Sequence, residues 1–497
     1  MKGVMRMGKI YLTRLIVETT SPMAINTGNR EIGFDSQLAR DANNLPYLPA
    51  TSLAGVWRNL AKDFLSEVSL KKWFGYAGKE SQSSVLTISN GIIHNSQNKP
   101  VKGLLSQEEI NQDSLLSLLV QARPHNRERV SINDRGVAKN TGKFDQILLP
   151  AGIRFCIDIK FYDDNLPQNT LNEEWQTLLN CWQNPMFALG ASTRNGLGKI
   201  NVIASNFNAI DLEDGIKAAQ QIKTHALLED IPLKNSVNFE TEDYVFAKLP
   251  LKALDNWRAG AGTQLLGRYN HGEADKSVAM ITYSEPQFEW STSAEKQIAK
   301  LSEPKAILCG SSIKGILAHR IAFHWRRHEA LTGKEAMWAE DMEHATHQQW
   351  ETRPEGLKAL LGFADEQEHD NSIAGSLYVD DCAISFQNTT IRHHNSIDRF
   401  TGGVRKGALY SEELLYQPEF TISLAIKKGT KLSVSLKNAL SDTLHDLKMG
   451  LLPMGAGSGR GTSLVMANPA IPWLVNIDQI ETNTDNVDEA ETQGEQA

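Results

Sequence analysis

The chain presents four short sequence patterns in its first half and again, in the same order, in its second half. The later copies lie 260, 287, 265 and 265 residues after the earlier ones. The matching segments are 49–55 with 309–315, 74–93 with 361–384, 131–142 with 396–407, and 189–191 with 454–456. Chance similarities scatter their separations, whereas a duplicated domain preserves them. The pattern therefore predicts two tandem copies of one fold, not a solenoid with a period of about 20–50 residues.

The length of 497 residues agrees with this prediction, because it is too long for a single hydrophobic core. We expect a first domain at 1–204, a linker at 205–244 and a second domain at 245–475. A helical insertion is expected at about 326–356 in the second domain. The last residues, 476–497, are acidic and poor in large apolar side chains, which predicts a disordered tail.

The hydrophobic pattern of each half predicts the same element order. In the first half, alternating apolar residues predict a strand at 10–17, and Thr51 or Ser52 begins a helix with apolar residues at the 3.6-residue period. Further strands are predicted at 85–93, 153–161 and 199–204, with a helix at 173–182. The second half repeats the pattern with strands at 245–254, 377–384 and 420–427 and a helix from Ser311 or Ser312. This βαββαβ order predicts an α+β class with two tandem ferredoxin-like domains.

The formal net charge of −8 does not exclude nucleic acid as a partner. Seven acids and no Lys or Arg lie between residues 478 and 497, so the rest of the chain is nearly neutral. Basic residues cluster locally, because six of them fall between residues 123 and 143. Loops of this kind hold a phosphate backbone whatever the total charge.

No apolar run approaches 18 residues, so we expect no membrane span. The first residues lack the apolar core of a secretory signal. The four cysteines, at 156, 181, 309 and 382, have the spacing of neither a zinc knuckle nor a disulfide framework. These features predict a protein of the reducing cytoplasm.

Two glycine-rich loops, at 190–198 and 455–461, stand at the same relative place in each half. Glycine allows the backbone to approach a phosphate, and Arg194, Lys199 and Arg460 supply positive charge beside it. Neither loop has the Walker or GxGxxG pattern, so a nucleotide hydrolase is not expected. The alternative to phosphate contact is that each glycine loop is only a tight turn before the last strand of its unit.

Histidines and acids provide the other candidate sites. His324 and His328 have the i, i+4 spacing of a metal pair, but the sequence offers no further ligands, so we expect ordinary histidines. Asp35 and Asp41 lie in the first long loop, where a carboxylate can hold a divalent cation or help to activate a ribose hydroxyl. The alternative for these acids is an Asx-turn or an ion pair with Arg40.

These segments together resemble the repeat-associated (RAMP) backbone subunits of type III CRISPR effector complexes. The similarity lies in FDSQLARDANNLPYLPATSLAGVWR, SINDR…TGKFDQILLPAG and LGASTRNGLGKI, and in CGSSIKGILAHR, NSIDRFTGGVRKGALYSEELL and MGAGSGRG of the second half. It covers roughly residues 8–204 and 245–467, and two such units in one chain are similar to the fused subunits of type III-D-like systems.

The resemblance implies a modified RNA-recognition-motif-like fold in a subunit that stacks along a guide RNA, with a β-hairpin thumb from each unit at about 121–148 and 391–415. It implies partners in guide RNA, target RNA and other subunits of the complex, and cleavage of the paired target by a loop aspartate with Mg²⁺ or another divalent cation. That aspartate, which also holds the metal, is Asp35, and Asp41 matches a more structural acid. The residues expected to contact RNA are Arg58, Arg123, Arg127, Arg129, Arg135, Lys139, Arg194, Lys199, Lys314, Arg392, Arg399, Arg405 and Arg460.

The second unit departs from the family pattern, because no Asp-Ser followed by Arg-Asp precedes Cys309. Asp275 is the nearest candidate acid, at a different distance. One unit is then expected to cut while the other only binds. Two alternatives stay open: a backbone subunit that binds RNA without catalysis, and a guide-processing endonuclease that acts without metal.

Overall fold

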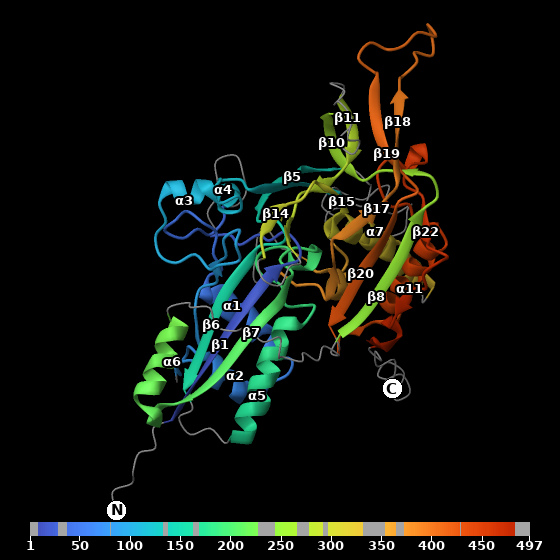
Figure 1. Ribbon diagram of the computed structural model, residues 1–497. Coiled ribbons are helices and arrows are strands. Elements are labelled where there is room, and N and C mark those ends of the chain that lie inside the picture. Colours follow the sequence, from blue (N-terminus) through green and yellow to red (C-terminus); the bar gives the residue numbers. More distant parts are fainter. Residues whose placement is uncertain are drawn as a thin grey trace, which may run out of the picture.

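The structure is a computed structural model in which two units of similar element order follow one another along the chain (Figure 1). It describes residues 8–27, 37–79, 81–132, 138–162, 168–226, 244–265, 278–291, 297–331, 353–363, 372–427 and 429–482. Asp35, Arg135 and Asp275 lie outside the described residues, as does the side chain of Lys139. Among the described residues, no helix has the length and apolar character required to cross a bilayer.

The first unit is built on one antiparallel sheet with the order β2-β6-β1-β7, in which β3 also pairs with β6. The inner strand at residues 9–19 is buried along almost its whole length, because helices cover both faces of the sheet. Its strands are β1 (Lys9–Thr19), β2 (Thr87–Ile88), β3 (Ile92–Ile93), β6 (Arg154–Tyr162) and β7 (Ile200–Asp211). Its main helices are α1 (Ala50–Ala61), α2 (Glu67–Phe74), α5 (Gln168–Asn180) and α6 (Ile216–Ala226).

An aromatic core fixes α1, α2 and α5 on one face of this sheet. Trp57 is fully buried, stacks edge-on against Trp182, and donates its indole N–H to the carbonyl of Leu178 at 2.8 Å. Trp73 donates to Glu174 at 2.7 Å. Each large ring buries much apolar area while its polar atom keeps a partner, which orders the helices as well as stabilising them.

The second unit repeats the sheet with the order β17-β20-β8-β22, extended by β15 and β12 beyond β17. Its strands are β8 (Tyr244–Ala253), β12 (Ser284–Glu285), β15 (Lys305–Leu308), β16 (Leu377–Val379), β17 (Cys382–Ser385), β20 (Glu419–Lys427), β22 (Val465–Ala467) and β23 (Leu474–Val475). Its helices are α7 (Gly310–Leu331), α10 (Glu355–Leu361) and α11 (Val434–Lys448). The mixed helix and strand content of both units agrees with the predicted α+β class, and the predicted strand–helix–strand–strand–helix–strand order is present twice.

Each unit carries a β-hairpin at the predicted place. The first is β4 (His125–Ile132) with β5 (Ala138–Leu148), which reaches toward the second unit (Figure 1). The second is β18 (Asn388–His394) with β19 (Tyr410–Tyr416), which projects from the body and pairs with β9 (Asn256–Trp257) and β11 (Val278–Thr282). β10 (Gly260–Leu265) completes that sheet.

Short elements fill the connections between these parts. They are α3 (Gln107–Gln112), α4 (Leu116–Leu119), β13 (Phe288–Trp290), β14 (Ala299–Leu301), β21 (Lys431–Leu432), β24 (Glu481–Thr482) and the 3₁₀ turns η1 (Cys181–Gln183), η2 (Thr193–Asn195), η3 (Leu212–Asp214), η5 (Ser458–Arg460) and η6 (Ile477–Gln479). The β13–β14 hairpin belongs to the second unit by sequence, yet Phe288 and Ala299 are buried in the hydrophobic core of the first.

Three predicted boundaries need correction. Residues 205–226 are not a linker, since β7 continues to Asp211 and α6 packs Ala218 against Ile10, Leu12 and Ile210 on the second face of the sheet. The tail does not begin at 476, because Ile477 and Ile480 are buried in the second core. Of the insertion expected at 326–356, residues 326–331 continue α7 and 355–356 begin α10; residues 332–352 lie outside the described part.

Candidate nucleic-acid interface

The loop that carries Asp35 is closed at its base by backbone hydrogen bonds. Asn26 and Leu38 form a bridge, Thr27 donates to the carbonyl of Gln37 at 3.0 Å, and Ala39 donates to Ile25 at 2.8 Å. Asp41 follows this base and accepts from the backbone N–H groups of Asn43 and Leu45 at 2.8 and 2.9 Å. Asp41 therefore forms the Asx-turn that was the structural alternative for this acid.

The segment at residues 22–26 is where three elements of the first unit meet. Met23 pairs with Leu149 at the end of the hairpin, and Ala191 of the glycine loop donates to Ala24 at 2.9 Å. Asn26 closes the base of the long loop. In the second unit, Trp257 pairs with Leu415, Ala456 donates to Arg258 at 2.7 Å, and Gly260 pairs with Thr282. Both units thus bring three parts together at one segment: the hairpin, the glycine loop and the long connection after the first strand. In the second unit this long connection is closed by the pairing of Gly260 with Thr282.

A side chain from a sheet turn caps the first helix of each unit. Ala50 donates its backbone N–H to Asn90 Oδ1 at 2.9 Å, and Gly310 donates to Asp381 Oδ1 at 2.7 Å. Of the basic residues predicted on these helices, Arg58 lies half-buried in the last turn of α1. Lys314 donates to the carbonyl of Leu377 at 2.9 Å, and burial, with the nearby charges of Arg194 and Arg353, lowers its pKa to about 8.

The first hairpin directs alternate residues of β4 onto the second unit. Arg127 is almost fully buried and donates to Glu285 at 2.7 Å and to Asp381 at 2.8 Å. His125 lies 2.9 Å from the same oxygen of Glu285, which also accepts from the hydroxyl of Tyr283. Burial opposes ionisation of Glu285, but these hydrogen bonds and the charge of Arg127 lower its pKa to about 2. Arg127 therefore occupies the joint between the units and is not presented to solvent.

Arg129, two residues on, points to the same side of β4. It is 9% exposed, and its Nε and Nη2 are buried without a hydrogen-bond partner among the described residues. Burial and the neighbouring charge of Arg127 lower its pKa. A buried guanidinium with unused donors favours an anion as its partner. Arg123 lies exposed before the hairpin.

The first glycine loop also faces the second unit. Arg194 donates to the carbonyl of Gly375 at 2.6 Å and lies 5.2 Å from the centre of the Tyr378 ring. Lys199 forms an ion pair with Asp380 at 3.1 Å. Gly196 has φ of +92°, and a Cβ atom there would lie 2.5 Å from Asp381 Oδ1, so this position requires glycine.

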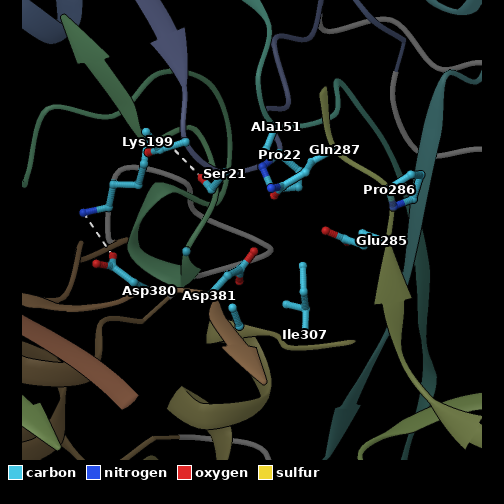
Figure 2. Close-up of a pocket in the computed structure, with 13 residues that line it drawn as sticks. Ser21, Pro22, Ala151, Lys199, Glu285, Pro286, Gln287, Ile307, Asp380 and Asp381 are labelled. Carbon is cyan, nitrogen blue, oxygen red and sulfur yellow. Dashed lines mark hydrogen bonds and ion pairs between the residues drawn. The ribbon is translucent and has the colours of Figure 1, made fainter. Parts of the chain in front are cut away.

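A pocket of about 260 Å³ lies at this joint (Figure 2). Thr20, Ser21, Lys199 and Gly196 line it from the first unit, and Glu285, Asp380 and Asp381 from the second. The Oε2 atom of Glu285 has no hydrogen-bond partner among the described residues. The acids give the joint a negative lining that the cations of the first unit neutralise in part.

The basic residues of the second hairpin are more open. Arg399 and Phe400 lie exposed in its tip, where Phe400 is 100% exposed. Arg405 lies 3.8 Å from Asp398, and Arg392 lies 3.7 Å from Asp255. Arg460, in the second glycine loop, contacts Glu412 at 3.2 Å, and this buried carboxylate also binds Arg258 and His394 at 3.0 Å.

The histidines of α7 have structural partners on α11. His324 lies 2.7 Å from Asp446, and His328 lies 2.8 Å from Asp442. The i, i+4 spacing thus matches two acids of the same spacing on the facing helix. Within the part of the chain that the structure describes, no group of three or more His, Cys, Asp and Glu is arranged to hold a metal ion.

The sequence prediction missed the acids of the joint. Glu285, Asp380 and Asp381 lie 158 or more residues from the cations that they pair with. The alignment of the two halves could have identified two of these acids. It places Asp380-Asp381 at the turn that Ser89-Asn90 occupies in the first unit.

The comparisons agree with the duplicated architecture. A family model described as RAMPs, the RAMP superfamily, matches residues 16–201 and residues 290–465, one region in each unit. No curated protein matches the chain.

Proposed function

Because the chain belongs to the RAMP superfamily, whose members bind RNA in CRISPR complexes, we propose that it is a tandem backbone subunit of a type III CRISPR ribonucleoprotein. In this proposal it holds guide RNA and cleaves the target RNA that is paired with the guide. Both units are ferredoxin-like in this proposal, which is supported by the antiparallel sheet of each, ordered β2-β6-β1-β7 in the first and β17-β20-β8-β22 in the second.

One observation carries the proposal: in both units the hairpin, the glycine loop and the long loop meet at a single segment, 22–26 and 256–260. A strand of RNA that contacts the hairpin then also passes the glycine backbone and the loop of Asp35. Distorted RNA is recognised chiefly by backbone contacts and stacking, which suits exposed arginines and the exposed ring of Phe400.

The predicted RNA contacts divide into two groups in this proposal. Arg399, Arg405 and Arg460 are accessible and take the RNA in the second unit, together with Arg392, and the exposed Arg123 does so in the first unit. Arg127, Arg194 and Lys199 hold the units together and position the surface. Arg129, at the edge of the joint, has two donor atoms left for a phosphate among the described residues.

Asp35 is the proposed catalytic residue of the first unit. It lies three residues before Leu38, whose bridge with Asn26 closes the loop. Thr282 occupies the place of Leu38 in the second unit through its pairing with Gly260, and the residue three positions earlier is Ala279. Alanine carries no carboxylate, so in this proposal the first unit cleaves the target RNA and the second unit only binds RNA.

A divalent cation fits this chemistry because hard cations take oxygen ligands. Asp41 uses Oδ1 for its turn, and in this proposal Asp35 supplies a carboxylate oxygen to the cation, with RNA oxygens completing the set. The bound cation would stabilise negative charge at the scissile phosphate. The carboxylate of Asp35 would accept the proton of the attacking hydroxyl, either a ribose 2′-hydroxyl or a water.

The test is target cleavage by the assembled complex. Asp35→Ala is expected to lower the rate at one cleavage position by about 100-fold or more with guide binding unchanged. Asp41→Asn is the matched control, because the amide oxygen still accepts the two backbone N–H groups, and its cut ladder should be normal. An unchanged ladder from Asp35→Ala supports the non-catalytic backbone instead, and cleavage that persists in chelator refutes the metal role.

A further inference from the structure

The pocket at the joint between the units has a lining that is acidic on balance (Figure 2). Three of the charged residues that line it are acids of the second unit, Glu285, Asp380 and Asp381, and one is a base of the first unit, Lys199. Lys199 is already paired within the chain, because its Nζ donates to the carbonyl of Pro185 and lies 3.1 Å from Asp380. The lining therefore favours a cation over an anion as the occupant of this pocket.

Glu285 is the acid of this lining that has an unused oxygen. Its side chain is 3% exposed, and its Oε1 atom lies 2.7 Å from Arg127 Nε and 2.9 Å from His125 Nε2. The hydroxyl of Tyr283 donates to the same Oε1 atom. The Oε2 atom, in contrast, is buried without a hydrogen-bond partner among the described residues. A buried carboxylate oxygen without a donor is costly, so this atom favours a ligand that supplies an N–H group.

The size and shape of the pocket limit what the ligand can be. Its volume of about 260 Å³ is far more than one water molecule requires, and it is just below the range of typical ligand sites. Figure 2 shows Glu285 on one side of the pocket and Asp380 on the other, with Asp381 between them. Apolar side chains share the lining: Pro22, Ala151, Pro286, Ile307 and Ala383. A small molecule with an apolar body and cationic ends matches this arrangement.

A bare metal ion matches the pocket less well. Asp381 has no oxygen to spare, because Oδ1 accepts from the backbone N–H of Gly310 and Oδ2 accepts from Arg127. No group of three or more His, Cys, Asp and Glu is arranged around a metal position in the described ranges of the chain. An alkyl ammonium group needs fewer ligands, since it carries three N–H donors on a compact head and its carbon chain packs against apolar side chains.

We propose that the joint pocket binds a short aliphatic diamine. One ammonium group donates to Glu285 Oε2, and the carbon chain lies against the apolar lining. The second ammonium group lies near Asp380, whose side chain is 41% exposed. Such a ligand contacts both units at once, so its binding stabilises the joint. This inference rests on the pocket and its acids and does not depend on RNA binding or cleavage.

The experiment titrates 1,4-diaminobutane into the full-length chain without RNA, at constant ionic strength and at pH 8. At this pH a neutral His125 does not compete for Glu285 as a cation. Calorimetry should show saturable binding, and the melting temperature should rise with the diamine concentration. n-Butylamine should bind about 10-fold more weakly, because it lacks the second ammonium group. Saturable binding of MgCl₂ but not of the diamine would overturn the choice of ligand.

Two variants place the ligand in the pocket. Ala383→Phe fills the pocket without removing an acid and should weaken diamine binding by about 10-fold or more. Ala209→Phe, the same substitution on the exposed part of β7, is the matched control and should bind normally. Normal diamine binding by a folded Ala383→Phe would overturn the site.

Glu285→Gln decides the matter if Ala383→Phe does not fold. It keeps an oxygen acceptor but removes the charge, and it should also weaken binding by about 10-fold or more. Because this substitution weakens the joint as well, binding is measured well below the melting temperature of the variant. Undiminished binding by Glu285→Gln, or no saturable binding by the unsubstituted chain, would refute the proposal.

Discussion

At the residue scale, the joint between the units shows that an arginine expected to contact RNA pairs instead with carboxylates of the same chain. The cluster of basic residues between 123 and 143 was visible in the sequence, and Arg127 in it was expected to contact RNA. The structure places Arg127 of that cluster against Glu285 and Asp381, far away along the chain. A strand pattern shows which residues share a face, but it does not show what covers that face. The role of Arg127 therefore required tertiary structure.

The pH dependence of stability tests this joint. Glu285 has a pKa of about 2 in the folded chain, below its ordinary value of 4.5, so its contribution is complete above pH 4.5 and is lost as pH falls toward 2. Glu285→Gln should therefore lower the free energy of unfolding by about 2–3 kcal/mol at pH 7 and by much less near pH 3. Chemical denaturation of both proteins from pH 7 to pH 2.5 measures the difference. A gap that stays constant over this range would contradict the assigned ion pair.

At the element scale, most long strands of the two main sheets and both hairpins lie where the sequence predicted them, because their patterns recur in the two halves. The hairpins expected at about 121–148 and 391–415 lie at 125–148 and 388–416. α6 was missed because its residues form a mixed, partly acidic segment, and among its described side chains Ala218 alone is fully buried against the sheet, with Ile222 partly buried beside it. The crossing of β13–β14 into the first unit was also beyond sequence reasoning, because Phe288 finds its core across a unit boundary.

The β13–β14 crossing makes Gly152 sensitive to substitution. Its φ is +85°, and an added Cβ would lie 1.9 Å from the carbonyl oxygen of Phe288, which is rigid backbone. Gly152→Ala should destabilise the chain by about 1–3 kcal/mol beyond the cost of the left-handed backbone. Gly103→Ala is the control, since Gly103 has φ of +66° with nothing within 4 Å. Equal losses of stability for the two variants, by thermal or chemical denaturation, would refute the close approach.

At the scale of the whole molecule, duplication explains both the likeness and the difference of the units. The sequence predicted two similar domains and the shared segments within them, and the two family matches agree. The units differ at Asn90 and Asp381, which cap their first helices, and in the proposed function at Asp35 and Ala279. In the proposed function such differences turn the repeat into an ordered pair, in which one unit cuts the RNA and the other only binds it. Backbone pairing shows which residues of the two units correspond, and the sequence alone does not show these correspondences.

The central claim is that both units lie on one guide RNA. The most direct measurement is the RNA content of the native complex, purified through a tag on this chain and digested with nuclease before sequencing. The account predicts small RNAs that carry CRISPR repeat sequence, protected over a length that shortens when Arg399→Glu and Arg405→Glu are introduced together. A complex of normal subunit composition that contains no such RNA would contradict it.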